Sequence, residues 1–129
     1  MIETAATALV TGGARRIGRA IVEDLAAHGF AVAIHANASR AEAHDLATEI
    51  AGAGGRAAVV SADLTDMAAA GGLVAAAQAA LGPVRLLVNN ASAFDDDSVL
   101  DFDEAVWDRH FALHVKAPAV LGQAIAPGT

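Results

Sequence analysis

The stretch ALVTGGARRIGRAIVEDLAAHG, residues 8–29, joins a short apolar run to an amphipathic one through a turn rich in glycine and arginine. After the turn, Ile17, Ile21 and Leu25 recur at helical spacing. Glycines between a strand and a helix let the backbone approach a pyrophosphate closely, and the free N–H groups and dipole of the helix favour an anion. The stretch therefore predicts a strand, a phosphate-binding turn and a helix. The alternative is a glycine-rich helix start with solvated arginines.

The composition predicts one α/β domain. The 129 residues have the length of a single domain, so we treat residues 1–129 as one unit. Over half of the residues are apolar, alanine is abundant and tyrosine is absent. This balance favours close-packed helices on a sheet over an all-β core.

Charge and cysteine content restrict the partners and the compartment. The net charge of -7 argues against nucleic acid as a partner, because such binding depends on Lys and Arg neutralising phosphates. A chain without cysteine forms no disulfide and no thiolate-ligated zinc site, which suits a reducing compartment, so we expect the cytoplasm. Residues 1–10 lack the basic start of a signal peptide, and their apolar run is too short to cross a membrane, so we expect no membrane partner.

Predicted strands and helices alternate along the chain. Short apolar runs bounded by turn residues predict buried strands at TALVT (7–11), AVAIH (31–35), AAVVS (57–61) and RLLVN (85–89). The stretches between them have helical spacing. Such alternation requires parallel pairing with right-handed crossovers. We therefore expect a Rossmann-type doubly wound parallel sheet, a three-layer αβα arrangement of four strands and a following long helix.

Glycine and proline predict where the helices end. Gly29, the GAGG at 52–55 and Gly82–Pro83 follow the three amphipathic stretches, as expected for glycine caps and a proline stop. A last segment from Asp103 to about Ile125 predicts a long helix that Pro118 should kink.

The glycine turn resembles the TGxxxGxG turn of the short-chain dehydrogenase/reductase family, and this resemblance covers essentially all 129 residues. One position departs, because Arg16 stands where the family's middle glycine usually lies. That departure resembles the pteridine reductase-like branch, in which an arginine of this turn contacts the cofactor phosphates. The resemblance implies cofactor contacts for Gly12, Arg15, Arg16, Ile17 and Gly18.

Residues after the second predicted strand favour NADP(H) over NAD(H). Folds that bind NAD hold the ribose 2′-hydroxyl with an acid about 20 residues past the glycine turn, whereas a 2′-phosphate needs positive or neutral donors. The sequence AIHANASRAEA, residues 33–43, has no acid before position 42. Asn37, Ser39 and Arg40 fall where a 2′-phosphate would lie, within reach of the turn's arginines. The alternative is that Ser39 caps the next helix and Arg40 is solvated.

After the third predicted strand, SADLTD at residues 61–66 matches the family again. The resemblance places Asp63 against the adenine amino group and Leu64 beside the ring. The alternative is that Asp63 is a loop acid or part of a helix cap.

After the fourth predicted strand, VNNASAF at residues 88–94 resembles the family's NNAG motif, with serine in the glycine place. The resemblance gives Asn89 the role of tying neighbouring strands together. It places Asn90, Ala91 and Ser92 along the ribose and nicotinamide. Phe94 either stacks on a flat heterocycle, as in pteridine reductases, or buries a loop.

The last segment carries one weaker match and one acidic run. LHVKAP at residues 113–118 places His114 where the family has the asparagine of an NxKxP-like pattern, which supports a proton relay. His114 either keeps that relay with a different group or has no catalytic role. The acidic run DDDSVLDFDE, residues 95–104, predicts a solvated face, because no histidines converge on it, and we expect no bound metal.

The resemblance implies an NADP(H)-dependent oxidoreductase that transfers a hydride to or from a carbonyl, an alcohol or a pterin-like substrate. In this family a tyrosine exchanges the proton, a lysine lowers the tyrosine's pKa and a serine orients the substrate. The chain has no tyrosine, and its lysine is Lys116. We therefore expect these residues to be the cofactor-binding half, inactive and unstable alone, of a protein that forms homodimers or homotetramers.

Two other functions compete with this interpretation. A complete, non-catalytic nucleotide-binding module could pair with another chain to cover its sheet edge. A methyltransferase-type domain would need an acid after the second strand, which the sequence lacks.

Overall fold

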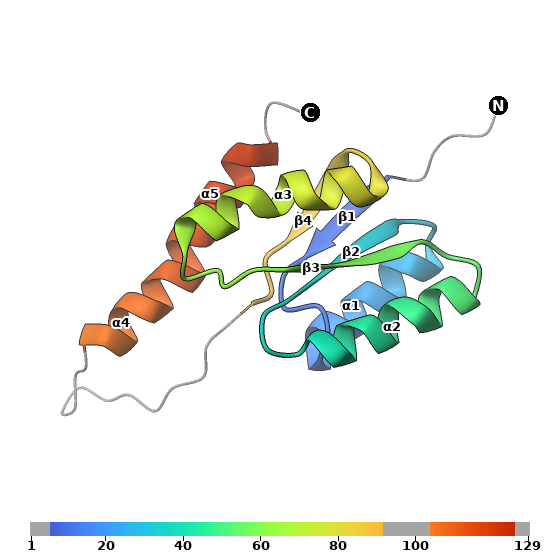
Figure 1. The fold of residues 1–129 in the computed structure, drawn as a ribbon, viewed down its shortest axis with the longest axis horizontal. Coiled ribbons are helices and arrows are strands. Elements are labelled where there is room, and N and C mark those ends of the chain that lie inside the picture. Colours follow the sequence, from blue (N-terminus) through green and yellow to red (C-terminus); the bar gives the residue numbers. More distant parts are fainter. Residues whose placement is uncertain (1–5, 92–103, 126–129) are drawn as a thin grey trace.

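The computed structural model describes residues 6–91 and 104–125, and its strands form one parallel sheet with the order β3-β2-β1-β4 (Figure 1). The strands are β1 (Thr7–Val10), β2 (Ala31–Ala36), β3 (Ala57–Ser61) and β4 (Val84–Val88). The predicted strands and their parallel pairing are confirmed. Because β1 pairs with both β2 and β4, the order reverses at β1, and ligands of such sheets bind in the crevice beyond the carboxyl ends at this reversal.

Helices cover both faces of the sheet, which confirms the predicted three-layer arrangement. The first three are α1 (Arg16–Ala27), α2 (Arg40–Gly52) and α3 (Met67–Leu81). Figure 1 shows α1 and α2 on one face and α3 with the carboxyl-terminal helices on the other. Gly29 and Gly54, just past the ends of α1 and α2, have φ values of 95° and 92°, so the predicted glycine stops are confirmed there.

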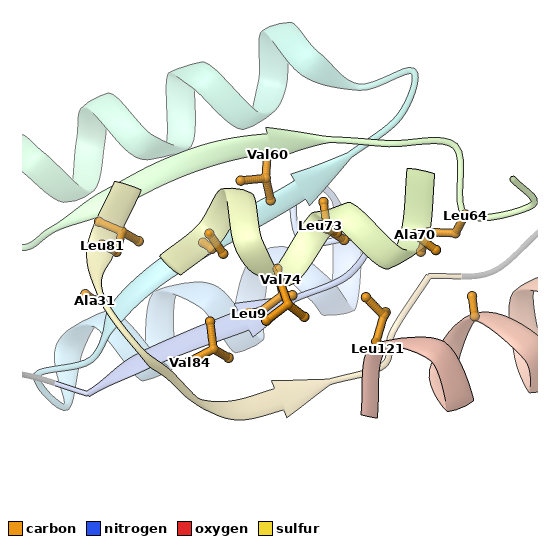
Figure 2. Close-up of a cluster of buried hydrophobic side chains, with 13 residues drawn as sticks. Leu9, Ala31, Val60, Leu64, Ala70, Leu73, Val74, Leu81, Val84 and Leu121 are labelled. Carbon is orange, nitrogen blue, oxygen red and sulfur yellow. The ribbon is translucent and has the colours of Figure 1, made fainter. Parts of the chain in front are cut away.

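Successive strand residues pack on opposite faces. Leu9 of β1 belongs to the cluster beneath α3, whereas Val10 belongs to the cluster beneath α1 and α2. Figure 2 shows Leu9 and Val84 of the sheet packed with Val74 of α3. Fully burying each such side chain contributes on the order of 1.5–3 kcal/mol. The two cores hold the strand ends, and therefore the turns that follow them, in fixed positions.

The long helix of the carboxyl-terminal part is interrupted, although not by a simple kink. It consists of α4 (Glu104–Phe111), a π-helical turn η1 (Ala112–Lys116) and α5 (Ala117–Ile125). The Ala117 N–H donates to the Ala112 carbonyl, one residue further back than in an α-helix. Pro118 has no N–H to continue the α-helical pattern, so the helix widens just before it.

Candidate cofactor-binding site

The glycine turn after β1 is held by hydrogen bonds on both sides. Gly12 adopts a φ of 61°, which favours glycine. Its N–H donates to His35 Nδ1 at 2.9 Å, and its carbonyl accepts from Asn90 Nδ2 at 3.0 Å. The next N–H, of Gly13, donates to the His35 carbonyl at 3.0 Å. The turn is therefore fixed before any ligand arrives.

Close packing explains the last glycine of the motif. A Cβ on Gly18 would collide with the Gly12 carbonyl oxygen and would lie 2.5 Å from Asn90 Nδ2. The start of α1 therefore touches both the turn and the loop after β4. Only glycine fits at this junction without moving backbone atoms.

Arg16 departs from the family's glycine and keeps the glycine conformation. Its φ of 53° lies in the left-handed region, and no other described non-glycine residue has a positive φ. This conformation costs a non-glycine residue roughly 1–2 kcal/mol. The cost is consistent with a side chain that is retained for its guanidinium, which is exposed at the rim of the site.

Thr11 connects the turn to the loop after β4. Its hydroxyl accepts hydrogen bonds from the backbone N–H groups of Asn90 and Ala91, at 3.0 and 3.1 Å, and donates to the Val88 carbonyl at 3.4 Å. The resemblance assigned a strand-tying role to Asn89, but the side chain that bridges the two segments is that of Asn90. Asn89 itself is exposed.

Two adjoining hollows, of about 340 and 480 Å³, lie along the carboxyl edge of the sheet. Both contain Gly12, His35 and Asn37 in their walls. The structure brings together ten residues predicted from the sequence to bind cofactor, which are Gly12, Arg15, Arg16, Ile17, Asn37, Ser39, Asp63, Leu64, Asn90 and Ala91. Gly18 packs beneath the turn, and Ser92 lies outside the described residues, as do Phe94 and most of the acidic run.

The segment after β2 presents neutral donors, with arginines beside them. Ser39 is the N-cap residue of α2, but its side chain makes no capping hydrogen bond. Arg40 does not line either hollow, and its Nε donates to the Asn37 carbonyl at 3.1 Å. Arg15 does line one and pairs with Glu42 at 3.1 Å.

Asp63 forms a tight turn at the end of β3. Its Oδ1 accepts from both the hydroxyl and the backbone N–H of Thr65, at 2.6 and 2.9 Å. These bonds lower the pKa of the Asp63 carboxyl, so it stays ionised. The cap of α3 is a different residue, Asp66, whose carboxylate accepts from the N–H groups of Ala68 and Ala69. The alternative of Asp63 as a helix cap is therefore wrong.

The residues lining these hollows that the sequence did not predict include His35, Thr65, Arg109 and Leu113. Arg109 and Leu113 lie one turn apart on the α4–η1 helix, so a helical spacing of four could have indicated them once the helix was placed over the site. His35 is buried, with only 3% of its surface exposed. No motif in the sequence marks its hydrogen bonds, because their acceptor and donor groups belong to the backbone of distant segments.

His114, predicted as a weak catalytic candidate, is exposed on η1 and does not line either hollow. Lys116 of the same turn lies with its Nζ 5.7 Å from the centre of the Phe111 ring. The structure therefore does not bring His114 to the same place as the predicted cofactor-binding residues.

A larger hollow of about 510 Å³ lies at the opposite, amino edge of the sheet. It is lined mainly by apolar side chains and backbone between α1 and α2, with Phe30 and Leu46 among them. It contains none of the glycine-turn residues, and it lies at the edge where such sheets do not bind their ligands.

Within residues 6–91 and 104–125, no cluster of three or more side chains could hold a metal ion. Over the same ranges, no helix combines the length and the apolar character needed to cross a membrane.

The fold and the site together define a dinucleotide-binding Rossmann-type protein, with its glycine turn at the point where the strand order reverses. A sequence profile described as short chain dehydrogenase matches residues 6–128, so the chain belongs to this family. Among curated relatives, a short-chain dehydrogenase/reductase from Cladobotryum, FrzI, is 39% identical over 117 residues, covering 91% of this chain and 45% of the relative.

Solved structures agree with this assignment. FolM alternative dihydrofolate reductase 1 from Brucella canis, complexed with NADP, is 54% identical, with a TM-score of 0.90 over 95% of this chain and 49% of the other. A short chain dehydrogenase from Burkholderia cenocepacia, also in complex with NADP, is 38% identical with a TM-score of 0.90, over 95% and 50% of the two chains. The chain thus spans about half the length of the proteins it matches.

Proposed function

We propose that this chain binds NADP(H) along the carboxyl edge of its sheet and is the cofactor-binding part of an NADP(H)-dependent oxidoreductase. The observation that carries the proposal is the hollow of about 340 Å³, which Arg15 and Arg16 line together with Asn37 and Ser39. No carboxylate lines this hollow in the described part of the chain. An acid that would hold a ribose 2′-hydroxyl is thus replaced by groups suited to a 2′-phosphate.

The start of α1 suits the pyrophosphate. Its N-cap, Arg15, makes no side-chain capping bond, so the first N–H groups of the helix are open to an anion. The N–H groups of Gly12 and Gly13 are already used within the protein. We therefore assign pyrophosphate binding to the backbone from Arg16 to Gly18.

The Arg15 guanidinium is available to bind the 2′-phosphate. Arg15 and Glu42 form an ion pair, but both side chains are more than half exposed. Such exposed pairs contribute little, about 0–1 kcal/mol, so a phosphate dianion can displace the Glu42 carboxylate. Arg16 lines the same hollow, and in the described part of the chain no ion pair holds it.

The adenine fits the second hollow. Asp63 uses Oδ1 for Thr65, which leaves Oδ2 to accept from the adenine amino group. Buried Leu64 offers an apolar surface next to it. The ionised state of Asp63, which its bonds to Thr65 favour, can accept a further hydrogen bond at Oδ2 because neither of its oxygens carries a proton.

The bound nicotinamide would supply or accept the hydride, and this chain would orient it through Ile17 of the glycine turn and through Asn90 and Ala91 of the loop after β4. The sequence contains no tyrosine, so we assign the proton transfer of the family's chemistry to residues outside these 129. Among substrates we favour pterin-like heterocycles over simple carbonyls, because the solved structure at 54% identity is titled an alternative dihydrofolate reductase and Arg16 departs from the family's glycine.

We also propose a cytoplasmic location and a homo-oligomer. The absence of cysteine suits a reducing compartment. Phe111 and Val115 of the α4–η1 helix expose 41% and 50% of their surfaces, which a subunit contact would cover. Size-exclusion chromatography with light scattering on the natural-length protein measures the oligomeric state.

Thermal unfolding with NADPH and with NADH tests the cofactor assignment. A ligand at about 100 times its dissociation constant adds roughly 2.7 kcal/mol of stability, so NADPH should raise the unfolding temperature at concentrations where NADH does not. Arg15→Ala should remove most of this preference. Arg56→Ala is the matched control, because Arg56 carries the same charge and lines only the hollow at the opposite edge.

Three results separate the hypotheses. A shift with NADPH together with oxidation of NADPH by a dihydropterin supports the enzyme. A shift without turnover of any carbonyl or pterin supports the non-catalytic module. No shift with either nucleotide, in protein shown to be folded, rejects the cofactor assignment.

A further inference from the structure

His35 is a buried side chain that three separate segments share. Its Nδ1 lies 2.9 Å from the Gly12 nitrogen, in the turn after β1, and its Nε2 lies 2.8 Å from the Ala62 carbonyl oxygen, just past β3. Its own main-chain carbonyl, near the end of β2, accepts from Gly13 N–H. The residue therefore connects the ends of three neighbouring strands.

The two partners determine the tautomer. A backbone N–H such as that of Gly12 can only donate, so Nδ1 must be the acceptor and carry no proton. A carbonyl such as that of Ala62 can only accept, so Nε2 must carry the proton. The imidazole is thus neutral, and both of its nitrogens are used inside the protein.

A ligand can therefore gain nothing from the imidazole directly, although His35 lines both hollows. What the ring does control is the Gly12 peptide. Gly12 is held by His35 on its N–H and by Asn90 on its carbonyl, and its left-handed conformation sets the path of the chain into α1. Each bond holds a different peptide unit, that before and that after Gly12, so loss of the His35 bond frees the unit between Thr11 and Gly12 to rotate.

We propose that His35 is a positioning residue for the dinucleotide: its Nδ1 fixes the Gly12 peptide and thereby the pyrophosphate-binding turn, while its Nε2 holds the loop after β3 in register with that turn. This inference rests on the proposed function, because it concerns the same cofactor site. It assigns the two bonds different consequences. The Gly12 bond governs cofactor affinity, and the Ala62 bond contributes chiefly to stability.

Burial supports this role. It lowers the pKa of His35, against an opposing effect of the hydrogen bond to Ala62, so the neutral ring needed by Gly12 is the favoured form.

Two isosteric variants separate the bonds. Asn places an acceptor where Nδ1 lies, so His35→Asn keeps the Gly12 bond and loses the Ala62 bond. Gln places a donor where Nε2 lies, so His35→Gln keeps the Ala62 bond and loses the Gly12 bond. Both variants remove the titrating group and a similar part of the buried ring, so each is the matched control for the other.

We would measure the dissociation constant for NADPH and the urea unfolding curve of the natural-length wild type and both variants. Leaving the Gly12 N–H without an acceptor costs about 1–3 kcal/mol, so His35→Gln should weaken NADPH binding by roughly tenfold or more, whereas His35→Asn stays within about threefold of wild type. In steady state the KM for NADPH should rise in His35→Gln at unchanged kcat.

Equal affinity losses in the two variants, or losses that follow their stability, would overturn the inference and leave the proposed function standing. Wild type that binds no NADPH would instead reject the proposed function. If neither variant folds, the ¹⁵N chemical shifts of the wild-type imidazole still test the inference, because they show which ring nitrogen carries the proton. A proton on Nδ1 would contradict the bond from Gly12 and overturn the inference.

Discussion

At the scale of single residues, Arg16 combines a strained backbone with a proposed phosphate contact. Its φ of 53° suits glycine, so Arg16→Gly removes a strain of roughly 1–2 kcal/mol, partly offset by about 0.4–1 kcal/mol of extra freedom in the unfolded chain. We expect the free energy of unfolding to rise by about 0.5–1 kcal/mol, while NADPH affinity falls by about tenfold with the lost charge-assisted hydrogen bond.

Chemical denaturation and NADPH titration measure the two effects separately. Arg16→Lys is the control, because it keeps both the charge and the strain and should leave stability unchanged. A less stable Arg16→Gly protein would show that the side chain packs in a way that its exposure does not suggest.

Also at this scale, His35 gives stability a defined dependence on pH. Burial lowers its pKa in the folded state, so below about pH 6.5 the unfolded chain binds a proton that the folded chain does not. The free energy of unfolding should therefore fall as pH drops from about 6.5 toward the folded-state pKa, by at most about 1.4 kcal/mol per pH unit from this group. The wild type and a His35 variant have the same charged residues in the hollows around position 35, which are Arg15, Arg16, Asp63 and Arg109.

Urea unfolding at about pH 7.5 and about pH 5.5, one pH unit on either side of the reference pKa of histidine, measures this dependence. In His35→Asn the slope attributable to this residue should vanish. A variant with the same pH slope as wild type would show that another group is responsible.

At the scale of elements, the helices differ in how they begin. Asp66 caps α3 through two hydrogen bonds to backbone N–H groups, whereas Ser39 at the start of α2 makes no side-chain cap bond. Asp66→Ala should therefore lower the free energy of unfolding by about 1 kcal/mol. Ser39→Ala should lower it by less than about 0.5 kcal/mol, as is usual for a substitution on the surface. Equal losses from the two alanine variants in thermal unfolding would mean that Ser39 caps its helix in solution after all.

The strands and the last helix also show which sequence patterns are sufficient to predict an element of the fold. The apolar runs predicted the four strands because the central strands β1 and β2 are buried at every position and the edge strands β3 and β4 are half-buried at most of theirs, so apolar side chains are favoured at consecutive positions. Pro118 predicted an interruption of the last helix for the correct reason, its missing N–H. It did not predict a π turn, because the way a helix absorbs one missing donor depends on how α5 packs against α3.

At the scale of the whole molecule, the candidate site is assembled from four turns that are distant in sequence. These turns comprise residues 11–18, 35–39, 62–65 and 90–91, and they meet at one edge of the sheet. NADPH should therefore slow amide hydrogen exchange in all four at once, because one ligand contacts them together. The turns around Phe30 and Gly54, at the opposite edge, are the internal control and should not change.

Hydrogen exchange followed by mass spectrometry resolves these segments. Protection confined to the glycine turn would indicate that the protein holds the nucleotide only through its phosphates. Protection at Phe30 and Gly54 would move the site to the other edge of the sheet.

The sequence by itself determined the αβ alternation, the glycine turn, the neutral segment after β2 and the polar residues after β3 and β4, because each is a local pattern with its own physical cause. Gly12 could be selected on that basis, whereas Asp63 and Asn90 are selected through the resemblance of their segments to the family's motifs. The tertiary structure decided that Asn90 rather than Asn89 bridges to the turn, that Asp66 caps α3, and that His35 joins three strand ends. These outcomes depend on hydrogen bonds to backbone groups many residues away, and a backbone group looks the same at every position of a sequence until the fold brings it to its partner.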